Sequence, residues 1–94
     1  MTDIKEILAS RGTKYGSMEG NADVTQSMMD VVATGEQYDS LSYMHKECIH
    51  MILHKISRMV NGDPYYVDNA TDIVGYAKLL EDWLIKMEES KNAS

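Results

Sequence analysis

Residues 41–60 carry two separate apolar stripes at helical spacing, and this pattern limits the possible folds more than any other feature. One stripe comprises Leu41, Met44, Cys48, Ile52 and Met59, and the other comprises Ile49, Leu53, Ile56 and Val60. A helix that is apolar on two sides is covered on both, so this segment is predicted to be the central helix. Asn61-Gly62 ends it, and Pro64 prevents its continuation.

The rest of the chain also has helical patterning and no convincing strand signal. We expect helices over 3–10, 22–34 and 68–88, with a glycine-containing loop over 11–21 and with Asp68 as the N-cap of the last helix. The prediction is a single all-α domain over residues 1–94. It has four helices, with the long third helix packed antiparallel on the C-terminal helix and a frayed polar tail over 89–94.

The chain has 94 residues, so it buries a modest core, and the two stripes of the third helix need more cover than three short partners supply. Eight Met and six Tyr are many for this length, and both residue types are common at adaptable interfaces. The sequence therefore predicts a homo-oligomer, a dimer or larger.

Charge and composition exclude several classes of function. The net charge of −6 comes without a basic patch, which disfavours binding to long nucleic acids. A single cysteine, Cys48, excludes an internal disulfide and cysteine-based zinc motifs, and its apolar neighbours predict a buried, inert thiol. No signal peptide or membrane span is evident, so a cytoplasmic protein is expected.

The charged residues on either side of the Gly-Asp-Pro turn are spaced too regularly to form only a solvent-exposed face. Lys55 and Arg58 are three apart on one predicted helix, and Asp68 and Asp72 are four apart at the start of the next. A buried charge requires a partner, so one interpretation is an ion pair between the two helices. The other is a phosphate site in which Arg58 offers a bidentate fork and Lys55 a point charge.

The segment Arg11-Gly12-Thr13-Lys14-Tyr15-Gly16 is a second candidate for ligand binding. Its two cations can contact a phosphate, and Tyr15 can stack on a base, although the Walker pattern is absent. The alternative is a glycine turn in which Tyr15 fills the core.

Metal binding and nucleophilic catalysis have weaker support. Asp68 and Asp72, with Glu47 as a third carboxylate, are candidate Mg²⁺ ligands. His50 and His54 have zinc-like spacing, but the Glu of the HExxH pattern and a third ligand are missing. No Ser-His-acid order is evident.

Three motifs in order resemble a phage and prophage family of small all-helical domains that carries no assigned activity. They are RxxxYG, KIxR and DxxxDIxGY, and they span about residues 11–80 with Arg11, Tyr15, Gly16, Lys55, Arg58, Asp68, Asp72, Gly75 and Tyr76. The resemblance implies an all-helical fold and a phage origin.

The chain is more distantly similar to the all-α nucleoside triphosphate pyrophosphohydrolases of the MazG and dimeric dUTPase type. That family holds Mg²⁺ with an ExxE pair on one helix and an ExxD pair on the next. Here the long helix has only Glu47, and the following helix has DxxxD at Asp68 and Asp72.

Three hypotheses follow. The first is a phage accessory protein that sequesters a small phosphorylated host signalling nucleotide, linear or cyclic, without hydrolysis and without a cofactor. Its expected ligand-binding residues are Arg11, Lys14, Tyr15, Lys55, Arg58 and Tyr76. The second is a divergent pyrophosphohydrolase that uses Mg²⁺ on Glu47, Asp68 and Asp72. The third is an acidic helical inhibitor of a host protein.

Overall fold

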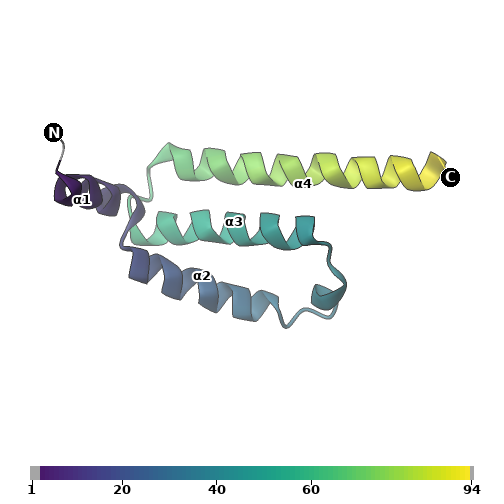
Figure 1. Cartoon of the computed structure of the whole chain (residues 1–94), viewed down its shortest axis with the longest axis horizontal. Helices are drawn as coiled ribbons and strands as arrows, with labels where there is room; N and C mark the ends of the chain where they lie inside the picture. Colours follow the sequence, from purple (N-terminus) through teal and green to yellow (C-terminus); the bar gives the residue numbers. More distant parts are fainter. Residues whose placement is uncertain (1–2, 94) are drawn as a thin grey trace.

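The computed structural model describes residues 3–93, and this part of the chain is helical and contains no strand (Figure 1). Its elements are α1 (Ile4–Tyr15), α2 (Met18–Val32), a 3₁₀ turn η1 (Tyr38–Ser40), α3 (Tyr43–Asn61) and α4 (Val67–Ala93). The prediction of an all-α fold is confirmed.

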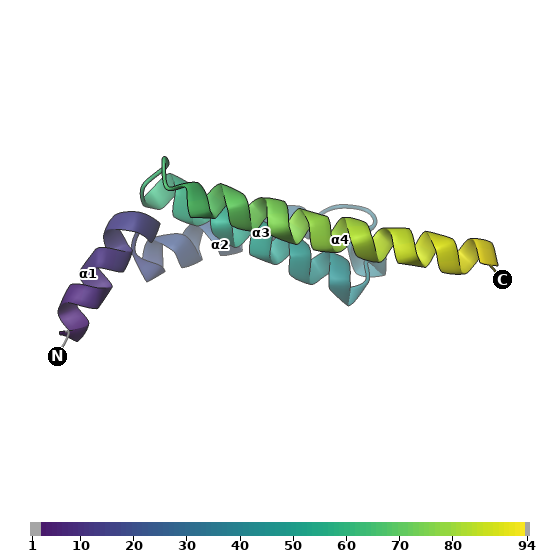
Figure 2. The same ribbon diagram turned by 90° about the horizontal axis from the view of Figure 1, so that it is seen from above.

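The packed part of the fold consists of three helices. α3 lies between α2 and α4 and is antiparallel to both, while α1 contacts α3 only at one end (Figure 1). In Figure 2 the three packed helices form a layer, and α1 points out of it. The predicted central position of α3 and its antiparallel packing on α4 are confirmed. The expectation that α3 is the longest helix is wrong, because α3 has 19 residues and α4 has 27.

The predicted loop over 11–21 is wrong, because α1 continues to Tyr15 and α2 already begins at Met18. A glycine inside a helix costs only about 1 kcal/mol relative to alanine, so Gly12 and Gly20 do not break these helices. Within residues 3–93, only Gly16 has a positive φ, at 82°. Ser17 caps α2, since its side chain accepts a hydrogen bond from Gly20 N at 3.0 Å.

The other helix ends also differ from the expected ones. The side chain of Ser42 caps α3 and accepts from the backbone N of His45 at 3.1 Å. α4 begins at Val67, so Asp68 lies in its first turn and is not the residue before it. α4 runs to Ala93, past the predicted end near residue 88, because Glu88, Glu89 and Lys91 are good helix formers.

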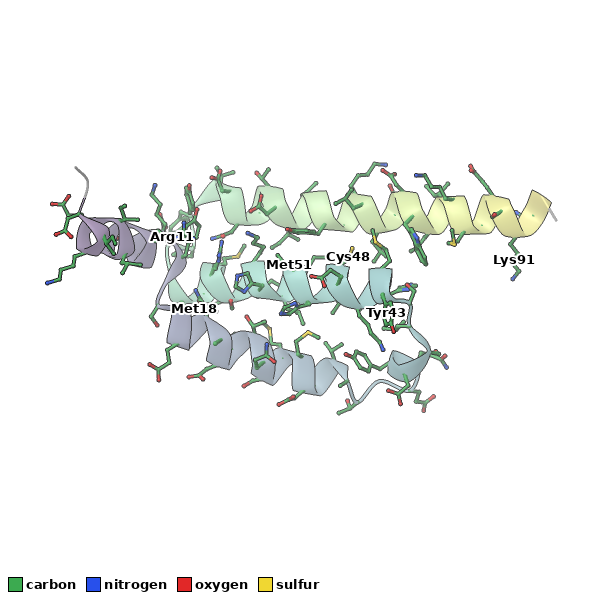
Figure 3. All side chains as sticks on the ribbon, in the orientation of Figure 1. Arg11, Met18, Tyr43, Cys48, Met51 and Lys91 are labelled. Atoms are coloured by element: carbon green, nitrogen blue, oxygen red, sulfur yellow. The ribbon has the colours of Figure 1, made fainter. Side chains whose placement is uncertain are left out.

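The interior of the layer is unusually polar. Among residues 3–9 and 11–92, Cys48 is the one buried apolar side chain; it lies on the side of α3 toward α4, and its predicted burial is confirmed (Figure 3). The other buried residues there are Asn21, Thr25, Ser57 and Asn69. Meanwhile many large apolar side chains remain exposed, including Val60 at 63% and Val74 at 68%. The layer therefore has little apolar core of its own.

The turn between α1 and α2 packs tightly on the C-terminal end of α3. The backbone N of Asp63 donates to the carbonyl of Lys14 at 3.0 Å. A Cβ atom on Gly16 would lie 2.7 Å from Cβ of Asn61, and one on Gly62 would collide with the carbonyl of Lys14. Both glycines are therefore required by the close approach of two backbones.

None of the helices within residues 3–93 combines the length and the apolar character needed to cross a membrane.

The contact at Gly62 gives a stability test with an internal control. We expect Gly62→Ala to destabilise the protein by about 2 kcal/mol, because the added methyl group has to displace backbone atoms. Gly75 lies inside α4, and a methyl group added there would meet no atom of another element within 4 Å, so Gly75→Ala should stabilise by about 0.5–1 kcal/mol. Urea unfolding of the two variants measures both effects, and equal effects would contradict the tight contact.

Candidate functional site

A hydrogen-bonded pair of asparagines fixes the place where α1, α2 and α3 meet. The side-chain amide of Asn21 donates to the backbone carbonyl of Tyr15 at 2.6 Å, and its Oδ1 accepts from Asn61 Nδ2 at 3.1 Å. Asn21 is only 4% exposed. The last residue of α1 is thus tied to α2 and, through Asn61, to the end of α3, which determines where the Tyr15 ring lies.

A cleft of about 480 Å³ opens beside this junction. Its walls come from α1, the α1–α2 turn, the start of α2 and the last turns of α3; Figure 3 shows Arg11 and Met18 at this end of the molecule. The lining residues are Leu8, Arg11, Gly12, Tyr15, Gly16, Ser17, Met18, Asn21, His54 and Arg58. The volume suits a small organic ligand.

Two arginines converge on one aromatic ring in this cleft. The guanidinium carbon of Arg58 lies 4.6 Å from the centroid of the Tyr15 ring, and that of Arg11 lies 5.4 Å from it. None of the ion pairs within residues 3–93 involves either arginine, and no carboxylate belongs to the cleft lining. Two guanidinium groups brought together without an acid form a site for an anion, in a chain whose net charge is −6.

His54 adds a titratable group to the same cleft. Burial lowers the pKa of His54 below its usual value of 6.5, and the positive charges of Arg58, Lys55 and His50 lower it further. The imidazole is therefore neutral at pH 7, and it offers one hydrogen-bond donor and one acceptor.

Tyr66 extends the aromatic surface beyond Tyr15. The two ring centroids are 5.6 Å apart with an interplanar angle of 59°, and Lys14 Nζ lies 5.3 Å from the Tyr66 centroid. Hydrogen bonds to the Asp68 carboxylate and to the Tyr15 side chain raise the pKa of Tyr66 well above its usual value, so the phenol stays protonated. Lys14 thus lies next to the cleft but does not line it.

The structure places Lys55 and Tyr76 away from the cleft. Lys55 Nζ lies 3.0 Å from Asp72 Oδ2, with side-chain exposures of 11% and 46%. The ion pair between the third and fourth helices is therefore present, as one of the two interpretations predicted. Tyr76 lies beside Asp72 in a separate groove along α4 that also includes Gly75 and Leu79. Of the six expected ligand-binding residues, the structure brings Arg11, Tyr15 and Arg58 together.

The three candidate magnesium ligands lie in three different places. Asp72 pairs with Lys55, Asp68 contacts Tyr66, and Glu47 lines a cavity between α2 and α3. Within residues 3–93 no three side chains of His, Cys, Asp or Glu are grouped as metal ligands.

The cavity that contains Glu47 is slightly larger, at about 560 Å³, but its charges differ. Its lining includes Asp30 and Glu47 as well as Lys46, whose ammonium lies 4.9 Å from the centroid of the Tyr38 ring. The two carboxylates counteract anion binding there. The cleft with Arg11 and Arg58 is therefore the better candidate site.

Sequence reasoning missed several residues of this cleft. Asn21 was not among the expected ligand-binding residues, Asn61 was expected only at the end of the third helix, and His54 was considered only for its zinc-like spacing with His50. No signal in the sequence separates Gly16 and Gly62 from Gly12, Gly20 and Gly35, which also follow polar residues.

Comparison with known proteins finds no matching family model, no similar curated protein and no similar solved structure.

The lowered pKa of His54 predicts a specific pH dependence. The folded protein binds fewer protons at His54 than the unfolded chain, so stability decreases as the pH falls below about 6.5 toward the folded pKa. We expect Arg58→Gln to raise the pKa of His54, because it removes a nearby positive charge. Proton NMR of the imidazole measures this shift. Lys78→Gln on α4 is the control for charge removal, and an equal shift in both variants would contradict the local effect.

Proposed function

We propose that the protein binds a small phosphorylated nucleotide in the cleft of Arg11, Tyr15 and Arg58 and holds it without hydrolysis. One observation carries the proposal: two arginines without carboxylate partners meet on one tyrosine ring in a ligand-sized cleft. Arginine is the residue best suited to bidentate contact with phosphate oxygens.

The remaining lining residues suit the rest of a nucleotide. Tyr15 and the adjacent Tyr66 give an aromatic surface for a base, and Leu8 and Met18 give apolar contact. Neutral His54 and the hydroxyl of Ser17 supply hydrogen bonds to sugar or base. A bound phosphate would in turn raise the pKa of His54, since it offsets the positive charge of Arg58.

The biological role that we propose rests on the sequence resemblance. A phage-encoded protein of this kind would sequester a host signalling nucleotide in the host cytosol and thereby weaken a defence response. It would act as a homo-oligomer, and sequestration requires neither a cofactor nor turnover.

The first experiment is a thermal-shift screen against mono-, di-, tri- and cyclic nucleotides, with and without Mg²⁺. A ligand at about 100 times its Kd adds about 2.7 kcal/mol, which raises the Tm of a domain of this size by about 10 °C or more. A shift without metal supports the proposal. A shift only with Mg²⁺, accompanied by product, would replace it with the pyrophosphohydrolase. The absence of any shift would overturn it in favour of a protein partner.

Arg58 gives the sharpest test at the level of one residue. We expect Arg58→Ala to weaken nucleotide binding by about 10- to 100-fold or more, because a charge-assisted hydrogen bond contributes about 1.5–3 kcal/mol. Lys46→Ala is the matched control, since it also removes a cation of α3 that lies on a tyrosine ring, Tyr38, but outside the cleft. Isothermal titration measures both affinities. If Arg58→Ala binds as tightly as Lys46→Ala, the cleft is not the binding site.

A further inference from the structure

The protomer exposes far more surface than a folded monomer of its mass. Its accessible surface is 6960 Å², whereas a monomer of 10.6 kDa exposes about 5,500 Å². Its radius of gyration is 16.6 Å, compared with about 12 Å for a compact domain of this length. The excess of about 1,500 Å² has three sources: α1 projects from the layer, α4 extends past the end of α3, and α2 and α4 lie on opposite sides of α3 without closing over it (Figures 1 and 2).

On one face of this layer, the surface that α3 presents is apolar. Toward α4, α3 presents His45, which meets the ring of Trp83, and Lys55, which pairs with Asp72. Toward α2 it presents Asn61, which bonds to Asn21. At about 100° per residue, the second apolar stripe falls between these two sides. This stripe, comprising Ile49, Leu53, Ile56 and Val60, therefore points out of the layer.

The neighbouring helices continue the same face. By the same helical geometry, α2 adds apolar residues spaced by four and three, and α4 adds apolar residues spaced by three, four and seven. Many are half-exposed or exposed, Val31 at 70% and Leu84 at 41% among them. We call this set the stripe face: Val24, Met28 and Val31 of α2, Ile49, Leu53, Ile56 and Val60 of α3, and Ala70, Ile73, Ala77 and Leu84 of α4.

The eleven residues of the stripe face are all uncharged, with Glu81 at its outer edge between Ala77 and Leu84, whereas the opposite face is charged. That opposite face carries the cleft with Arg58, the cavity with Glu47 and the groove with Asp72. Two chains that each carry a net charge of −6 repel one another, so contact between copies is least costly on an uncharged surface. An uncharged apolar face is also complementary to itself, as a two-fold interface requires.

We propose that the stripe face is the interface of a two-fold symmetric homodimer. Part of the excess of about 1,500 Å² per protomer lies on the stripe face, which leaves room for a stable interface of at least about 1,200–2,000 Å² over both subunits. The dimer is a two-layer, six-helix assembly with the apolar core that the single layer lacks. The nucleotide clefts lie on its two outer faces, so dimerisation leaves both open.

Ala77 and Leu79 give a matched pair of variants for testing the dimer. Both are exposed residues of α4 only two positions apart, but Ala77 lies on the stripe face and Leu79 lines the groove on the opposite face. Light scattering on the full chain should give twice the 10.6 kDa protomer mass for the wild type and for Leu79→Glu. Ala77→Glu should give the protomer mass or a dissociation constant raised at least 100-fold.

Val60→Glu is a second interface variant, because Val60 is 63% exposed in the protomer and lies on α3. Circular dichroism checks helicity, and a Tm that rises with protein concentration in the wild type is an independent sign of dimerisation. A monomeric wild type with a concentration-independent Tm would overturn the proposal. So would dimers that survive both Ala77→Glu and Val60→Glu, or that are weakened as much by Leu79→Glu.

Discussion

The close contact between the α1–α2 turn and the end of α3 determines most of what this protein presents to solvent. Gly16 and Gly62 allow the two backbones to meet, and the amide of Asn21 bonds to the carbonyl of Tyr15. Without that contact α1 would have little to hold it, because it packs on the layer only at this end. The Tyr15 ring would then lose its place beside Arg58. The cleft is therefore a product of backbone contact and hydrogen bonds, and apolar packing contributes less.

The layer itself reverses the usual distribution of polar and apolar residues. Ser57 and Asn69 are almost completely buried, and the side-chain amide of Asn69 and the hydroxyl of Thr25 have no hydrogen-bond partner within residues 3–93. Each such group costs about 1–3 kcal/mol. Part of the exposed apolar surface that could offset this cost lies on the open face, where Val31, Val60 and Leu84 are found. A protomer built in this way gains its missing hydrophobic stabilisation only when another surface covers that face.

The sequence was sufficient to predict the parts of the fold that follow from helical periodicity. Two stripes on α3 and the Gly-Asp-Pro turn led to a central helix packed antiparallel on α4. Opposite charges on these helices left an ion pair as one of two interpretations, and the structure forms it between Lys55 and Asp72. The prediction for the α1–α2 connection was wrong because glycines were interpreted as helix breakers. Helix propensity is a weak effect that tertiary contacts override. The roles of Asn21 and His54 depend on contacts between distant segments, which periodicity does not report.

The sequence correctly showed that the second stripe of α3 is apolar, but it did not show in which direction that stripe points. Periodicity showed that α3 has two apolar sides that need more cover than the rest of the chain supplies, but it did not show which side each neighbouring helix covers. In the structure α2 contacts α3 on a side that includes Ser57 and Asn61, which leaves the second stripe on the open face. Arg58 and Val60 are two residues apart and lie on opposite faces of the layer. One helix therefore separates a charged surface that suits an anionic ligand from an uncharged surface that suits a second copy.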